Sequence, residues 1–262
     1  MRIWQKIIVS IVAIMLLALV VLRFNSHAPA PVPEGSVPAD DIVSYCIGHA
    51  VNDESLELLA ISGKGQIDTG ERHGRFLLVC DISAEADIKK PGYIPPDKIH
   101  YRIDIEEKKP LKVQLGDING DGVNEVAICV YKTAKFHPIM AKRPFFFDLV
   151  DGNLIPVWLG SRLSRPFDDY ILYDIDDDNI DEIISIEQLE NGNRAIAVYN
   201  WSGFGFEMFT QSEEFGGNLS FNIDGKTSET GEVSVVFSAQ RNKNTEQTEL
   251  KISLNDDRLI CK

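Results

Sequence analysis

Oxygen-bearing side chains recur with one spacing at two places in this chain. The segments Asp117–Glu125 and Asp174–Glu182 both carry them at their first, third, fifth and ninth positions. Alternate residues of a tight loop can turn inward together, so three short side chains can surround one hard cation. The carbonyl of the seventh residue and the longer Glu at the ninth would complete the shell. Ligation by oxygen alone suits Ca²⁺, which accepts about six to eight oxygens in flexible geometry.

The spacing therefore predicts two calcium sites, each with its own loop. The sixth position needs an unusual backbone, which Gly122 adopts freely and Asn179 tolerates. The alternative is a pair of metal-free turns, because Asn, Asp and Gly are also the commonest turn residues. The ligands predicted for the first site are Asp117, Asn119, Asp121, the carbonyl of Val123, and Glu125. Those predicted for the second site are Asp174, Asp176, Asp178, the carbonyl of Ile180, and Glu182.

An EF-hand does not fit these loops. It requires a bidentate Glu at the twelfth position and helices on both sides, but that position is Ile128 in one copy and Ser185 in the other. The flanking residues favour strands. The loops and their flanks resemble the calcium loops of FG-GAP or VCBS repeats, which occur in the β-propeller of integrin α subunits and in many bacterial surface proteins. The resemblance implies bound Ca²⁺, and a loop that joins the first two strands of a propeller blade.

The rest of the chain is rich in short apolar runs separated by turn residues, which predicts an all-β fold. The runs group into four-stranded units, with Ser44–Ala50 as a candidate first strand of the N-terminal unit. A third copy of the loop, Ser220–Gly225 with Ser228 at its ninth position, is interpreted as one that binds no metal. The spacing of the units favours a β-propeller-like array, and a β-sandwich is the alternative.

The N-terminus predicts a membrane anchor. Ile7–Leu22 is apolar except for Ser10, and Arg2 and Lys6 precede it, which places the N-terminus in the cytoplasm. A cleaved signal peptide is the competing interpretation. The predicted organisation is an anchor or transmembrane helix over residues 1–23, a Pro-rich linker over 24–41, and an extracytoplasmic β-repeat domain over 42–262.

The formal net charge of the chain is −14, and three of its basic residues precede residue 24, so the predicted domain is more acidic still. Nucleic acid is therefore excluded as a partner on electrostatic grounds. The four cysteines, Cys46, Cys80, Cys129 and Cys261, leave the disulfide state open. No catalytic motif for a hydrolase, a nucleotide-binding enzyme or a redox protein is present. Enzymatic activity stays open, because propellers do host enzymes.

One basic and aromatic segment, residues 132–147, interrupts the acidic background. It is either a long hairpin whose phenylalanines enter the core, or a surface that binds an anionic or aromatic ligand. The ligand-binding hypothesis names Lys135, His137, Lys142, Arg143 and Trp158. The function we expect is a membrane-tethered, calcium-binding module that binds a cell-surface protein, a glycan or an anionic wall polymer. An extracytoplasmic hydrolase or lyase acting on glycans is the alternative.

Overall fold

The computed structural model describes residues 32–51, 55–90, 92–221, 233–241, 244–255 and 258–261. The chain divides into two compact units, Met1–Ser36 and Val37–Lys262. The predicted anchor and the first part of the predicted linker lie outside the described residues. Within the part that is described, no helix is long and apolar enough to cross a membrane.

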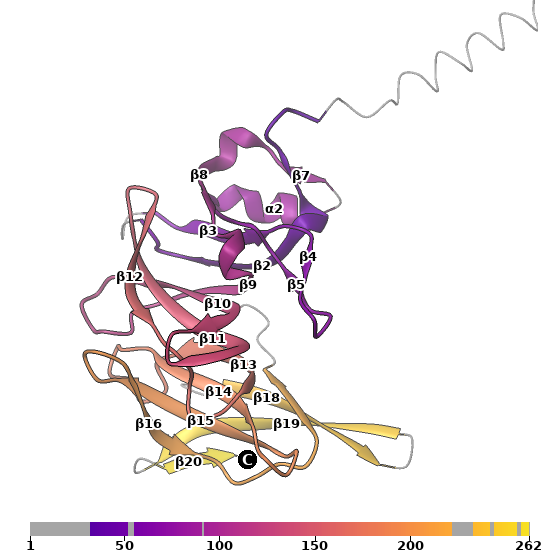
Figure 1. Ribbon diagram of the computed structural model, residues 1–262, viewed down its shortest axis with the longest axis vertical. Coiled ribbons are helices and arrows are strands. Elements are labelled where there is room, and N and C mark those ends of the chain that lie inside the picture. The colour runs from indigo at the N-terminus through magenta and orange to yellow at the C-terminus, as the bar shows by residue number, and fades with distance from the viewer. Residues whose placement is uncertain are drawn as a thin grey trace, which may run out of the picture. The chain divides into compact units, whose positions relative to one another are not determined.

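The unit Val37–Lys262 is built from four antiparallel sheets of four strands, and in each sheet the strands lie in chain order (Figure 1). Sheet 1 consists of β2 (Ile42–Gly48), β3 (Glu57–Ser62), β6 (Phe76–Asp81) and β8 (Ile99–Asp104). Sheet 2 consists of β9 (Pro110–Gly116), β10 (Glu125–Ala134), β11 (His137–Val150) and β12 (Asn153–Leu159). Sheet 3 consists of β13 (Phe167–Tyr173), β14 (Glu182–Gln188), β15 (Arg194–Trp201) and β16 (Phe206–Gln211). Sheet 4 consists of β17 (Asn218–Phe221), β18 (Val233–Arg241), β19 (Asn244–Asn255) and β20 (Arg258–Cys261).

Successive sheets pack face to face and share a core. Side chains alternate between the two faces of a strand, and the phenylalanines of β11 show the consequence. Phe145 and Phe147 enter the core between sheets 1 and 2, whereas Phe146 enters the core between sheets 2 and 3. Ile184 and Leu219 belong to a third core, between sheets 3 and 4. Because inner strands have a neighbouring core on both faces, every residue of β3 is buried, which explains its continuous apolar sequence.

The other face of sheet 1 is covered by short segments of the chain. This cap consists of β1 (Val37–Pro38), η1 (Ala39–Asp41), η2 (Ile82–Ala84), α2 (Glu85–Ile88), β7 (Tyr93–Ile94) and η3 (Pro96–Lys98). Val37, Ala84 and Ile94 bring it into a core with Leu58 and Ala60 of β3. Among the side chains that the structure describes, no shared core joins sheet 4 to sheet 1.

Side chains also join the first strands of neighbouring sheets. Gln114 of β9 accepts a hydrogen bond from the backbone N–H of Leu172 and donates one to the carbonyl of Tyr170, both at 2.9 Å. In the same way, the Ser44 hydroxyl of β2 accepts from the N–H of Val113 at 3.3 Å. These side chains thus satisfy polar backbone groups at the strand edges, where the two neighbouring strands belong to different sheets and do not pair with each other.

The expectation of an all-β fold is confirmed, since the described residues are mostly strand. The candidate first strand at Ser44–Ala50 corresponds to β2, and both predicted loops join the first and second strands of their sheets. Sequence analysis did not anticipate the cap, the hairpin of β4 (Gly65–Gln66) and β5 (Arg72–His73), or the turn η4 (Glu106–Lys108). All four cysteines are free thiols.

Arg143 is a fully buried arginine that stabilises the end of the β10–β11 hairpin. The strand pairing is irregular between Lys132 and Ala134, so nearby carbonyls are not all used by the ladder. The Arg143 guanidinium donates to the carbonyls of Lys132 at 2.7 Å, His137 at 3.0 Å and Ile139 at 2.7 Å. Burial lowers the pKa of this side chain from its ordinary value.

We expect Arg143→Met to lower the free energy of unfolding by about 2–4 kcal/mol, because buried carbonyls would lose charged donors. The matched control is Lys135→Met, which changes an exposed lysine on the same hairpin and should stay within about 0.5 kcal/mol of the parent. Urea denaturation followed by circular dichroism measures both. Equal midpoints for the two variants would contradict a structural role for Arg143.

Candidate metal centre

The two predicted calcium loops occupy equivalent places in sheets 2 and 3. The first loop (residues 117–124) joins β9 to β10, and the second loop (residues 174–181) joins β13 to β14. Each leads into a buried glutamate that begins the second strand of its sheet, Glu125 or Glu182. Each glutamate is hydrogen-bonded to the start of its own loop. The Glu125 carboxylate accepts from the backbone N–H of Ile118 at 3.0 Å, and the Glu182 carboxylate accepts from that of Ile175 at 3.1 Å.

In the second loop, three of the predicted ligands meet. Carboxylate oxygens of Asp174, Asp176 and Glu182 lie within 4.8 Å of one another, a spacing at which one ion could contact all three. Asp178 instead accepts a hydrogen bond from the N–H of Ile180 at 2.8 Å, which tightens the turn.

The turn of the second loop is tight enough to need a left-handed backbone. Asp177 and Asn179 have φ values of 62° and 67°. Asp and Asn tolerate this region better than other residues with a Cβ, so the Asp/Asn-rich sequence serves the backbone as well as a metal.

The first loop has the same outline but a different arrangement of side chains. Asp117 accepts from the N–H groups of Gly120 at 2.7 Å and Gly122 at 2.8 Å, and both glycines have positive φ. The side-chain amide nitrogen of Asn119 donates to Glu125. Rotating that amide by half a turn would point its oxygen at the same place, so the donor set also fits an oxygen-preferring cation.

The electrostatics of both loops favour a cation. Burial, with a smaller contribution from repulsion by the neighbouring aspartates, raises the pKa of Glu182 to about 8 and that of Glu125 to about 7. Asp148 of β11, a residue that sequence analysis missed, adds to the negative charge around Glu125. The described part of the chain places no lysine, arginine or histidine in an ion pair with any of the carboxylates of these loops.

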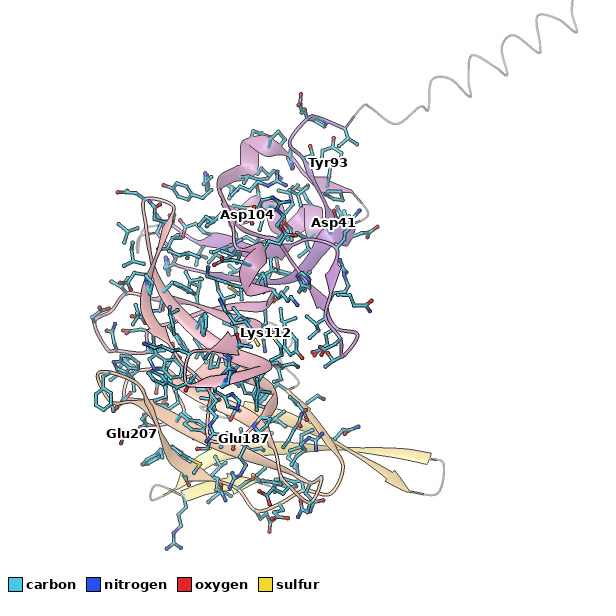
Figure 2. The ribbon with its side chains drawn as sticks, viewed as in Figure 1. Asp41, Tyr93, Asp104, Lys112, Glu187 and Glu207 are labelled. Carbon is cyan, nitrogen blue, oxygen red and sulfur yellow. The ribbon has the colours of Figure 1, made fainter. Side chains whose placement is uncertain are left out.

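Another buried glutamate of sheet 3 provides a useful contrast (Figure 2). Glu187 of β14 is fully buried, but the Arg165 guanidinium lies 3.2 Å from it and the Tyr199 hydroxyl donates to it. Its charge is therefore compensated within the protein. The loop glutamates have backbone N–H donors and no basic partner, which is the state of a carboxylate that a metal ion could neutralise.

Sheet 1 contains a related loop that sequence analysis did not find. Glu57 begins β3, is buried, and accepts from the backbone N–H of Ala50 at 3.0 Å, as its counterparts do in sheets 2 and 3. However, His49 and Val51 occupy the first and third positions, so the side-chain carboxylates are missing there. The buried glutamate is thus a structural feature of these loops with or without a metal. The sequence signal that could have revealed this loop is a glutamate directly before an apolar strand.

Sheet 4 holds the remaining copy. Ser220 belongs to β17, and residues 222–228, which complete the predicted third copy of the loop, lie outside the described residues.

The five residues predicted to bind a ligand are not gathered on one surface. Arg143 is buried, and His137 lies against it with Nδ1 3.1 Å from the guanidinium. Lys135 is exposed, 5.4 Å from the ring of Phe136. Trp158 packs against Phe146 and Phe206 in the core between sheets 2 and 3.

Lys142, the fifth of these residues, borders a cavity of about 540 Å³ between sheets 1, 2 and 3. Lys142 forms an ion pair with Glu71 at 2.7 Å, and Lys112, which is labelled in Figure 2, forms one with Asp169 at 2.7 Å. Asp168, the third carboxylate of the wall, pairs with Arg194. Each carboxylate that lines the cavity therefore has a cationic partner, and the pair of Lys112 with Asp169 connects sheet 2 to sheet 3. The lining residues are Val43, Ser44, Tyr45, Glu71, Leu111, Lys112, Cys129, Lys142, Asp168 and Asp169.

No protein-family model matches the chain, and no curated protein matches it either. The resemblance of the two loops to FG-GAP or VCBS calcium loops therefore stays a prediction from the sequence.

Proposed function

We propose that this chain carries an extracytoplasmic calcium-binding β-repeat domain that serves as a binding module for a partner at the cell surface. The observation that carries the proposal is the repeated loop. In the second loop three carboxylates converge, and at the equivalent place in the first loop Asp117 and Asp121 repel the buried Glu125; no ion pair of the described residues compensates either group. Hard divalent cations take such oxygen sites, and Ca²⁺ tolerates their irregular geometry best.

The residues of each loop have distinct parts in this proposal. Asp174, Asp176 and Glu182 would hold one ion, and Asp117, Asn119 and Glu125 the other, with further oxygens from Asp121, Asp178 and the carbonyls of Val123 and Ile180. A bound Ca²⁺ supplies positive charge that removes the mutual repulsion of the carboxylates. Because the ligands come from both the end of one strand and the start of the next, the ion would fix that connection.

A β-propeller-like array is the finer fold that we propose for the domain. Four-stranded antiparallel units that stack face to face are the building blocks of propellers. Three shared cores between successive sheets favour such an array over a two-sheet sandwich. The cap on sheet 1 covers the face that a closed ring would offer to sheet 4, and this favours an open arrangement.

A binding role agrees better with the site than hydrolysis does. Acid–base hydrolysis of a glycan commonly uses two carboxyl groups with different pKa values and access to the substrate. The carboxylates of the cavity are held by Lys112, Lys142 and Arg194. We therefore keep the proposal to a partner such as a surface protein, a glycan or an anionic wall polymer.

Millimolar calcium should raise the melting temperature of the protein. Extracellular calcium modules often have Kd values of about 10⁻⁴–10⁻³ M. Calcium at about 1 mM, which is roughly one to ten times that Kd, would stabilise the folded state by about 0.4–1.4 kcal/mol per site. Differential scanning fluorimetry with calcium and with a chelator measures the shift. The double variant Asp121→Ala with Asp178→Ala should abolish it, because each site loses a charged oxygen ligand.

The matched control removes two acidic residues outside the loops, Asp97→Ala with Asp151→Asn. This control should keep the calcium response, since it changes net charge by the same amount without touching a ligand. A melting curve that calcium and chelator leave unchanged in the parent protein would contradict the proposal.

The apolar run Ile7–Leu22, with Arg2 and Lys6 before it, supports a single-pass anchor with the domain outside the cytoplasm. We expect the protein to fractionate with membranes and its C-terminal domain to be digested by protease added to intact cells or protoplasts. The control is a cytoplasmic marker protein that the protease does not reach. Release of a soluble form that begins near residue 31 would show a cleaved signal peptide instead.

A further inference from the structure

Asp181, the eighth residue of the second loop, contacts the first residue of both loops. Its carboxylate accepts a hydrogen bond from the backbone N–H of Asp117 at 3.0 Å, and its own N–H donates to the carbonyl of Asp117 at 2.7 Å. The backbone N–H of Asp174 also interacts electrostatically with this carboxylate. One side chain thus lies between the first predicted ligands of the two sites, Asp117 and Asp174, and holds the backbone at Asp117.

The loops are also in close steric contact at this point. A Cβ on Gly116 would lie 2.7 Å from the Asp181 carboxylate and 2.9 Å from the side chain of Leu172. A Cβ on Gly120 would lie 2.9 Å from Ile180. A Cβ at either glycine would have to push the ends of these side chains aside, so the two loops are closely packed here.

The same link recurs between the first loop and its predecessor in sheet 1. Asn124, the eighth residue of the first loop, donates from Nδ2 to the carbonyl of His49 at 2.9 Å. In both pairs, the eighth residue of one loop binds the backbone of the first residue of the preceding loop. Only the pair linked by Asp181 has acidic ligands in both loops, and only there is the linking side chain itself a carboxylate.

Charge connects the two sites as well as geometry. The Asp181 carboxylate is repelled by the carboxylates of Asp174 and Asp117, the first predicted ligands of the two loops. A cation in either loop would relieve part of that repulsion and would hold Asp181 against the N–H groups of both loops. The other loop would then need less ordering when its own ion arrives.

From this geometry we infer that Asp181 is a positioning residue that couples the two loops, so that they take up Ca²⁺ with positive cooperativity. The inference rests on the proposed calcium-binding function. Coupling between two sites is reciprocal, and it typically changes affinity by about 5- to 150-fold. Loss of either site should therefore weaken the other by the same factor.

Isothermal titration calorimetry of the full chain with CaCl₂ tests this coupling. The second site is disabled with Asp178→Ala, and we expect the Kd of the remaining first site to rise on the order of 10-fold above its value when the second site is filled. In an Asp181→Ala background, where the carboxylate is lost and only the backbone bond from residue 181 to the carbonyl of Asp117 remains, the same Asp178→Ala change should leave the Kd of the first site within about twofold.

Two further variants make the outcome specific. Asp177→Asn removes one charge from the second loop at a position that Asn also tolerates, keeps the link, and should keep the cooperativity. Asp181→Asn replaces Asp181 by the residue type found at position 124. It takes the place of Asp181→Ala if that variant does not fold, and it should weaken the coupling. Two ions that bind independently to the parent protein, or coupling that persists in both Asp181 variants, would overturn the inference and leave the calcium proposal intact. Absence of any calcium binding would overturn both.

Discussion

A buried glutamate at the start of the second strand determines the shape of the loop in each of sheets 1, 2 and 3. Glu57, Glu125 and Glu182 are nearly inaccessible to solvent, and each accepts a backbone N–H from the residue seven positions before it. Burying a carboxylate is unfavourable unless hydrogen bonds or an opposite charge compensate it. At Glu57, where His49 and Val51 leave the first and third positions of the loop without an acid, the backbone hydrogen bond is part of that compensation. Where aspartates crowd the same space, a cation would supply further compensation, and the proposed function follows from that difference.

The stacking of the sheets gives these loops their mutual relation. Because successive sheets share a core and their first strands are joined through Ser44 and Gln114, the loops at the ends of those strands are brought together. The links made by Asn124 and Asp181 are a consequence of that arrangement. Each of these loops is therefore held by a neighbouring sheet as well as by its own.

The sequence predicted the features that depend on local spacing. The two loops, the strands that flank them and the all-β class could be read from alternation and turn residues, and the phenylalanines at 145 and 147 do enter the core as one interpretation expected. Features that depend on tertiary contacts could not be read. Arg143 looked like a surface cation, but an irregularity in strand pairing creates carbonyls that bury it. The loop of sheet 1 was hidden because its first and third positions, His49 and Val51, lack oxygen side chains, and the role of Asp181 requires knowing which loops are neighbours.

Crystals of the protein grown with calcium would test the central claim most directly, through anomalous difference density measured at long wavelength. The account predicts a peak among Asp174, Asp176 and Glu182 and a second peak among Asp117, Asp121 and Glu125. It also predicts that the amide of Asn119 turns its oxygen toward the second of these ions. Density that shows no ion in either loop at millimolar calcium, with the loop carboxylates held by backbone N–H groups alone, would contradict it.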